Sequence, residues 1–430
     1  MLRFPIRGVV LLLALSLALA ACGGAQTEGP AATGTPGRAL TPVMTITAPP
    51  ILVTAEEVPA EYQSVYQELW AALEAARDTF SAQAGTDVPL SLSLELLTAN
   101  GNRGEDLLQP ATLDATRLFL DRFTALGAKG VTLQIVYPLF DEGFPRHDEY
   151  VEFYRAVVQE VRQRGMLLLI ETSAPFVGTQ YSSLTVDYSG KTPEGYLQER
   201  LEQARAIAHE LQPDYLSIAE EQVTERMLTG LDLSTEDYFE FLRAAPAAID
   251  PPPGVKLGAG SGSWESPELI QRIISETSLD YVDIHVYPLS NGFTDYLEVT
   301  SQWASVARAA GKQVVIGEAW LYKTSVEELQ GGIAFQEVFG RDSYSFWQPL
   351  DALFMETAVE LARASGIQVL SFFWSNYLFA YADYAQVSDL TGRELQQAAN
   401  AAAAGAITRG DLSDAGRAYQ RLASGSSAGE

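Results

Sequence analysis

Short apolar runs alternate along the chain with longer segments whose apolar positions recur at helical spacing. Eight of the short runs have the length and composition of β-strands: Leu90–Leu97, Gly130–Tyr137, Met166–Thr172, Tyr215–Glu221, Val255–Ala259, Tyr281–Tyr287, Gln313–Trp320 and Gln368–Trp374. Helical patterns lie between them, for example at Thr112–Ala128, Asp148–Arg164, Thr192–Leu211 and Thr235–Ala248. Alternating strands and helices predict a parallel sheet of the α/β class, and eight such units predict that it closes into a (β/α)8 barrel, the TIM barrel.

The ends of these segments have the chemistry of helix boundaries. Thr192-Pro193-Glu194 and Ser266-Pro267-Glu268 each place a capping hydroxyl, a proline and an acid at a helix start. Four glycines separate a helix from the next strand, as helix-ending glycines do: Gly127, Gly165, Gly311 and Gly366. A further helix, Tyr62–Ala84, precedes the first strand, and we expect it to pack beneath or beside the barrel.

Polar and apolar residues alternate in three of the predicted strands, so one face of each strand is polar. The polar sets are Ser91, Ser93 and Glu95; Tyr215, Ser217, Ala219 and Glu221; and Asp283, His285 and Tyr287. We expect these sets to point into the barrel. Barrel enzymes carry their reactive groups at the carboxyl ends of the strands, where Glu221 ends the fourth strand and Glu318 lies near the end of the seventh.

Two carboxyl groups at one barrel mouth are what hydrolysis of a glycosidic bond requires. One must protonate the leaving oxygen, and the other must be ionised to attack the anomeric carbon or activate water. Aromatic rings offer flat apolar faces to sugars, and the predicted rim carries four: Trp264, Tyr287, Trp320 and Trp374. By contrast, Trp347 lies in a helical pattern and should serve packing, while Glu95 and Glu171 should be structural or orient the substrate.

Three segments resemble motifs of the clan A retaining glycoside hydrolases, with endo-galactanases and cellulase-like enzymes as the nearest comparisons. Asp214-Tyr215-Leu216-Ser217-Ile218-Ala219-Glu220-Glu221 resembles the motif in which a small residue precedes Asn-Glu, whose Glu is the acid/base. Gln313-Val314-Val315-Ile316-Gly317-Glu318 resembles the motif of the nucleophile. Asp283-Ile284-His285-Val286-Tyr287-Pro288 resembles the segment that supplies His and Tyr beside it. The order of the motifs, over roughly residues 88–400, is a stronger signal than any one of them.

The resemblance implies a mechanism with retention of anomeric configuration, in which Glu318 is the nucleophile and Glu221 the acid/base. It also implies that His285 and Tyr287 contact the substrate region, with Tyr287 able to donate a hydrogen bond to ionised Glu318. Glu95 is a further candidate for substrate binding. No cofactor is expected.

Two positions depart from the family pattern. Glu220 stands where the family has the Asn that holds the substrate 2-hydroxyl, which implies a changed substrate contact. Glu220 could reach the site or turn toward the helices and pair with a base. The Arg found at the end of the second strand has no clear counterpart, because Gln134 and Tyr137 occupy that region.

The composition restricts the partners. The chain has 28 Lys and Arg against 55 Asp and Glu, a net charge of −27, which disfavours nucleic acid and anionic lipid and fits a neutral carbohydrate substrate. We expect a monomer. We also expect no metal site, because the chain has only 3 His and two of them, His147 and His209, fall in a loop and a helix outside any ligand pattern. The glycine-rich run at 258–262 lacks the lysine of a phosphate loop.

The first residues have the pattern of an export signal. Arg3 and Arg7 precede an apolar run from Val9 to Ala21 that is too short to span a bilayer comfortably. The run ends in Leu19-Ala20-Ala21-Cys22, which resembles the lipobox of bacterial lipoproteins, and Cys22 is the only cysteine. An ordinary secretory signal with a chance cysteine is the alternative. We expect a signal peptide at 1–21, a flexible linker at 22–55, a barrel with an extra helix at 56–422 and a disordered tail at 423–430.

This pattern predicts an extracytoplasmic protein that is anchored to a bacterial membrane through lipid on Cys22. The variant Cys22→Ser should therefore lose the lipid and move from the membrane fraction to the soluble fraction on cell fractionation. If the variant remains in the membrane fraction as the natural protein does, the anchor assignment is wrong.

Three functions are compatible with these features. The first is a retaining glycoside hydrolase. The second is a non-catalytic barrel that binds glycan, because Glu220 and the missing Arg are consistent with a degenerate site. The third is a solute-binding lipoprotein of a transporter, but that fold has two α/β lobes, and eight evenly repeated units argue against it.

Overall fold

The computed structural model describes residues 58–425, with gaps at 84, 180, 263–264, 289–292, 326, 329–330 and 334. The predicted signal peptide, the linker, Cys22 and Trp264 therefore lie outside the described residues, as does most of the predicted tail. None of the described helices is both long and apolar enough to cross a membrane.

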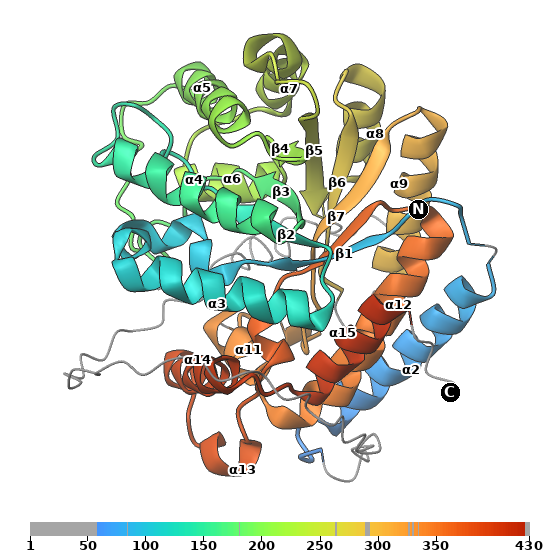
Figure 1. Cartoon of the computed structure of the whole chain (residues 1–430). Coiled ribbons are helices and arrows are strands. Elements are labelled where there is room, and N and C mark those ends of the chain that lie inside the picture. The colour runs from blue at the N-terminus through green and yellow to red at the C-terminus, as the bar shows by residue number, and fades with distance from the viewer. Residues whose placement is uncertain are drawn as a thin grey trace, which may run out of the picture.

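Eight parallel strands close into a barrel in sequence order, because β1 pairs with both β2 and β8. The strands are β1 Ser91–Glu95, β2 Gly130–Gln134, β3 Leu167–Glu171, β4 Tyr215–Ser217, β5 Lys256–Gly262, β6 Tyr281–Val286, β7 Gln313–Ala319 and β8 Val369–Phe372. Figure 1 shows them at the centre of the molecule with helices around them. The predicted (β/α)8 barrel is confirmed, and a fold of two α/β lobes is excluded.

The alternation of side chains along the strands divides the core into two parts. Apolar residues such as Leu92, Leu94 and Ile284 are buried in the main core. Inside the barrel, a separate apolar cluster lies toward the amino ends of the strands: Leu169, Tyr215, Tyr281, Val315 and Val369. Ser93, Glu95, Asp283 and His285 are fully buried, as the predicted inward orientation requires. Buried polar groups are thus concentrated beyond this apolar cluster, toward the carboxyl ends of the strands.

The helices follow the strands as the sequence predicts. The longer ones are α2 Gln63–Ser81, α3 Pro110–Leu126, α4 His147–Gln163, α5 Pro193–Leu211, α7 Thr235–Ile249, α8 Pro267–Glu276, α9 Phe293–Ala309, α12 Gln348–Ser365, α14 Gly392–Arg409 and α15 Asp414–Ser424. Shorter helices are α6 Gln222–Thr229, α11 Phe335–Arg341 and α13 Tyr384–Val387. The caps predicted at Thr192 and Ser266 are present, since each side chain accepts a backbone hydrogen bond. The four predicted helix-ending glycines all have positive φ.

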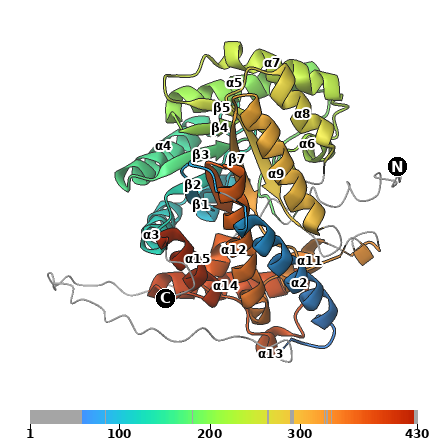
Figure 2. The same cartoon turned by 90° about the vertical axis from the view of Figure 1, so that its right-hand side faces the viewer.

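The first and the last described helices both pack against α12. Helix α2 packs beside the barrel against α12 and α9, as Figures 1 and 2 show. Helix α15 packs against α12 and α3. Because α15 continues to Ser424, the first two residues of the predicted disordered tail are helical.

The glycine-rich run at 258–262 belongs to strand β5. A Cβ atom on Gly260 would lie 2.0 Å from the backbone oxygen of Asp283 in β6, so no side chain fits between these two strands. The glycines therefore serve close strand packing, which explains the run without a bound phosphate.

All the predicted strands except β5 end earlier in the structure, and β4 shows the largest difference. Strand β4 ends at Ser217 rather than Glu221, because Glu221 is the N-cap of α6 and its backbone oxygen accepts the first hydrogen bond of that helix, from Glu225. Strand β8 ends at Phe372, and the chain then turns into a short 3-10 helix at Ser375–Leu378. The residues after each strand still lie at the barrel mouth.

Candidate active site

His285 stands at the centre of the candidate site and contacts both predicted catalytic carboxylates. Its Nδ1 lies 2.8 Å from Oε1 of Glu221 and 3.5 Å from Oε2 of Glu318. Strand β6 aims the ring inward, and His285 is fully buried. Burial acts to lower the pKa of His285, but Glu318, Glu171 and Glu221 together raise it well above its ordinary value. The ring thus lies between the two carboxyl groups and is hydrogen-bonded to Glu221.

Glu318 lies on β7, directly beside His285 in the pairing of β6 with β7. The register of this pair shifts between Asp283 and His285, which brings His285 level with Glu318. The hydroxyl of Tyr287 donates to Oε2 of Glu318 at 2.6 Å, so the predicted hydrogen bond is present. Burial raises the pKa of Glu318 well above its ordinary value, His285 lowers it, and Glu171 and Glu221 raise it further.

Glu221 reaches the site from the start of α6 rather than from the strand. Its Oε1 shares a hydrogen bond with Nδ1 of His285, and its Oε2 accepts from the hydroxyl of Thr224 one turn along the helix. These two contacts fix both oxygens of the carboxyl group. The loop from β4 into α6 thus brings Glu221 to the same side of the barrel as Glu318.

Glu265 is a buried residue at this mouth that the sequence reasoning missed. Its Oε1 accepts from the backbone N–H of Val223 at 2.9 Å, and its Oε2 accepts from the hydroxyl of Ser261 at 2.6 Å. Glu265 therefore ties the end of β5 to the first turn of α6, next to Glu221. Burial raises its pKa to about 7, against the hydrogen bond from Ser261, and the negative charge of Glu221 adds to the rise. Glu265 lies just after a glycine-rich strand, in a segment with no helical or strand pattern, so nothing in the sequence singled it out.

Glu220, the departure from the family motif, bridges β4 to β3. Its Oε1 accepts from the backbone N–H of Thr172 at 3.0 Å, and the side chain is 2% exposed. Burial raises the pKa of Glu220 well above its ordinary value, and the neighbouring Glu171 adds to the rise. Within the described ranges, no ion pair joins Glu220 to a base, so the predicted pairing with a base is not observed. Glu220 instead binds the backbone at the end of β3.

A buried arginine holds the same two strand ends together. Arg200 of α5 forms an ion pair with Glu225 of α6 and donates to the backbone oxygens of Thr172 and Ile218 at 2.8 and 2.9 Å. Arg200 is 1% exposed. It thereby links α5, β3, β4 and α6 and fixes the segment that carries Glu220 and Glu221. It does not replace the Arg that is absent from the second strand, where Gln134 accepts from Asn100 and the hydroxyl of Tyr137 donates to Glu199.

Two further glutamates lie fully buried inside the barrel. Both carboxylate oxygens of Glu95 on β1 and of Glu171 on β3 have no hydrogen-bond partner among the described residues. Oε1 of Glu171 lies 3.6 Å from Nε2 of His285, just beyond hydrogen-bond distance. Burial raises the pKa of Glu95 well above its ordinary value, and Glu171 adds to the rise. The structure thus confirms the predicted inward orientation of Glu95.

The three predicted aromatic platforms that the structure describes are buried against other aromatic rings. Trp320 is fully buried and packs against Tyr377, with ring centroids 5.9 Å apart. Trp374 is 2% exposed and packs against Phe373 at 5.0 Å. Tyr287 stacks on a neighbouring ring and uses its hydroxyl for Glu318. These rings therefore pack the region around the mouth in this structure and do not expose a face to a sugar. Trp347 is a buried packing residue, as predicted.

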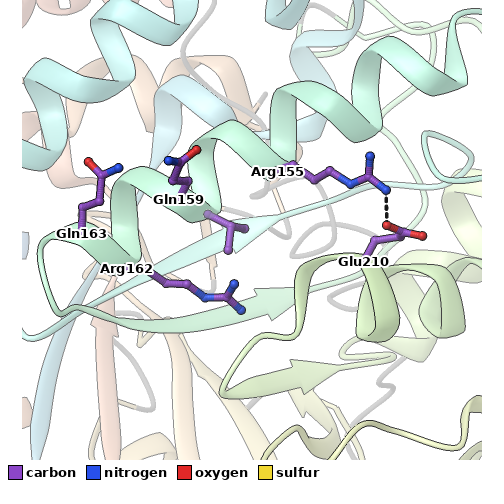
Figure 3. Close-up of a pocket in the computed structure, with 6 residues that line it drawn as sticks. Arg155, Gln159, Arg162, Gln163 and Glu210 are labelled. Atoms are coloured by element: carbon purple, nitrogen blue, oxygen red, sulfur yellow. Dashed lines mark hydrogen bonds and ion pairs between the residues drawn. The ribbon is translucent and has the colours of Figure 1, made fainter.

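The site is closed in this structure. Glu221 is 5% exposed and Glu318 is fully buried. A cavity lined by Glu220 and Glu221 has a volume of about 10 Å³, enough for about one water molecule. A larger hollow of about 440 Å³ lies on the outer surface between α4 and α5 (Figure 3), where Arg155 pairs with Glu210. That hollow contains none of the predicted site residues.

Comparisons with known proteins support the fold. No family model and no curated protein matches the sequence. Among solved structures, the chain is similar to the exo-β-1,4-mannosidase Op5Man5 from Opitutaceae bacterium strain TAV5, with 14% identity and a TM-score of 0.51 over 79% of this chain and 60% of that one. The chain thus spans less than two thirds of the mannosidase. GH5_18 from Bifidobacterium longum has 12% identity and a TM-score of 0.49 over 79% of each chain.

A third similar structure is the GH26 β-mannanase BoMan26A from Bacteroides ovatus, with 13% identity and a TM-score of 0.41 over 77% of this chain and 90% of that one. The structural neighbours are clan A glycoside hydrolases. At these identities the likeness shows the shared barrel and leaves the chemistry to the side chains of this chain.

Proposed function

We propose that this protein hydrolyses a glycosidic bond with retention of anomeric configuration, with Glu318 as the nucleophile and Glu221 as the acid/base. One observation carries the proposal: both carboxyl groups contact the same nitrogen of buried His285, at 2.8 and 3.5 Å. Hydrolysis of a glycosidic bond requires two carboxyl groups close together, and here one imidazole holds them near each other at the carboxyl ends of the barrel strands.

The reaction proceeds in two displacements. In the first, an oxygen of Glu318 bonds to the anomeric carbon while the glycosidic C–O bond breaks, and the leaving oxygen takes the proton of Glu221. In the second, Glu221 removes a proton from water, whose oxygen bonds to the anomeric carbon and releases Glu318 as a carboxylate. Each displacement inverts the carbon, so the product keeps the starting configuration.

The spacing of the two carboxyl groups accommodates retention. Because one nitrogen contacts both, their nearest oxygens are no further apart than the sum of 2.8 and 3.5 Å. Retaining pairs lie about 5–5.5 Å apart, whereas inverting pairs lie roughly 6.5–9.5 Å apart to admit a water molecule between them and the sugar. The stereochemistry of the product distinguishes the two.

The surrounding residues support the two roles. In the reactive form Glu318 is ionised, and Tyr287 at 2.6 Å is the donor that stabilises this charge. Thr224 and His285 hold the carboxyl group of Glu221 in place. Glu265 keeps the start of α6 attached to β5, so that Glu221 stays in reach of the leaving oxygen.

The charge of the site supports a neutral sugar as the substrate. The ionised nucleophile Glu318 and the net charge of −27 on the chain would repel a uronic acid or a sulfated sugar. The name of the neighbouring mannosidase makes β-mannosides a reasonable first choice for testing. Export and lipid anchoring at Cys22 remain part of the proposal and rest on the sequence motif.

One observation favours a second function, a non-catalytic barrel that binds glycan. The fully buried Glu318 and the packed rings of Trp320 and Trp374 leave little room for a sugar at the anomeric position. A degenerate site of this kind would bind glycan elsewhere on the barrel and would release no product.

Incubation with a panel of substrates tests the proposal. The panel contains 4-nitrophenyl β-mannoside, β-glucoside, β-galactoside and β-xyloside, together with mannan, galactan, cellulose and xylan. We expect release of nitrophenol or reducing sugar from at least one member. Binding to a polysaccharide without any release, under conditions in which a known glycosidase acts, would favour the non-catalytic barrel.

A further inference from the structure

Several buried polar atoms inside the barrel lie close together and have no hydrogen-bond partner among the described residues. Within the described part of the chain, no hydrogen bond reaches either oxygen of Glu171, Oε1 of Glu318 or Nε2 of His285. All three residues are fully buried. We propose that Glu171, His285 and Glu318 form a binding site for a divalent transition-metal ion, with Zn²⁺ as the preferred ion.

The spacing of the donors suits a metal ion. One donor atom from each of the three residues can be chosen so that all lie within 4.8 Å of one another. Tetrahedral Zn²⁺ with bonds of about 2.0–2.2 Å holds its donors about 3.4 Å apart, so side-chain rotations that bring these atoms closer together complete the site. Nε2 is the nitrogen of His285 that faces Glu171, 3.6 Å from its Oε1 and without a hydrogen bond, whereas Nδ1 contacts Glu221.

A buried imidazole nitrogen without a hydrogen bond distinguishes this group from an ordinary acidic cluster. Mg²⁺ and Ca²⁺ prefer sites made only of oxygen, whereas one imidazole with two carboxylates suits Zn²⁺ or Mn²⁺. Affinity for such a mixed site increases from Mn²⁺ to Zn²⁺.

The local sequence of β7 makes room for Glu171. A Cβ atom on Gly317 would lie 1.9 Å from Oε1 of Glu171 and 2.7 Å from Oδ1 of Asp283. Only glycine at this position lets the carboxyl group of Glu171 lie over β7, beside Glu318. Glu95 is the fourth carboxylate nearby, with both oxygens unpaired among the described residues, and it adds negative charge next to the site.

Metal binding and hydrolysis use the same carboxylate. A Zn²⁺ ion on Glu318 occupies the oxygen that attacks the anomeric carbon, so the metal-bound protein cannot form the glycosyl intermediate. The inhibition rests on the proposed function, whereas the binding itself does not. We therefore infer that the protein has a metal-bound state in which it cannot hydrolyse a glycoside.

Calorimetric titration of the full-length protein with ZnCl₂ after treatment with a chelator tests the inference, with metal content measured by mass spectrometry. We expect one Zn²⁺ per chain, weaker binding of Mn²⁺ and no competition from Mg²⁺. Glu171→Gln should weaken Zn²⁺ binding by at least about 100-fold, since the loss of even an outer-shell partner costs about 10–100-fold. Glu210→Gln, the same chemical change on the exposed α5 surface, should leave binding unchanged.

The wild-type titration decides the question even if a variant fails to fold. Absence of a stoichiometric Zn²⁺ site in the wild-type protein overturns the inference, and so does equal affinity in a folded Glu171→Gln variant. If hydrolysis is found, Zn²⁺ should inhibit it and a chelator should restore it. Zn²⁺ binding without hydrolysis would contradict only the proposed function, and hydrolysis without Zn²⁺ binding would contradict only this inference.

Discussion

Glu318→Ala should lower the turnover of every hydrolysed glycoside by at least about 10,000-fold, because no other group can form the bond to the anomeric carbon. The loss should not depend on the leaving group. The measurement is the kcat of the purified variant on the substrate that the wild-type protein hydrolyses. Glu210→Gln on the surface of α5 is the control and should keep wild-type activity.

Glu221→Ala should behave differently, and the contrast assigns the two roles. A 2,4-dinitrophenyl glycoside needs no proton for the first displacement, so the variant should still form the intermediate from it. An alkyl glycoside or a natural disaccharide needs the proton and should be hydrolysed far more slowly. Substantial activity in Glu318→Ala, or equal loss on both substrate types in Glu221→Ala, would contradict the assignment.

Arg200→Met should destabilise the fold by about 3–5 kcal/mol, because it leaves the carboxylate of Glu225 buried without its partner. The backbone oxygens of Thr172 and Ile218 also lose their donor. Chemical or thermal unfolding followed by circular dichroism measures the change. The activity should fall as well, since the segment that carries Glu221 loses its link to β3.

Two controls separate the buried charge from the loss of the side chain. The double variant Arg200→Met with Glu225→Met should recover part of the lost stability, because it removes both charges together. Arg243→Met breaks partly exposed pairs with Glu236 and Glu276 and should cost at most about 1 kcal/mol. If the double variant is less stable than Arg200→Met, the unpaired buried charge is not the cause.

The barrel could be predicted from sequence because its determinants are local and repeated. Each strand carries a short apolar run, and capping residues such as Thr192 and Ser266 mark the helices that separate the strands. The alternation in β1 and β6 placed Glu95 and His285 inside the barrel, since side chains on a strand alternate between its two faces. These features depend on a few neighbouring residues and need no knowledge of the tertiary contacts.

The finer arrangement of the site depends on contacts between distant segments. The end of β4 could not be placed because α6 competes for Glu221 as its N-cap. Glu265 acquires its role only when β5 and α6 meet. The burial of Trp320 against Tyr377 depends on the packing of two loops. The grouping of Glu171 with His285 and Glu318 requires three strands to be correctly registered. The sequence pattern identified the reactive residue types, whereas tertiary packing decided how they meet.

The stereochemistry of the reaction tests the central claim most directly. Proton nuclear magnetic resonance of the first minutes of hydrolysis, on whichever substrate of the panel is cleaved, identifies the anomer that forms before mutarotation. The account predicts that the first product has the same anomeric configuration as the substrate, because Glu318 and Glu221 each act in two successive displacements. A first product of inverted configuration would contradict the role of Glu318 as a nucleophile and the two-step mechanism with it.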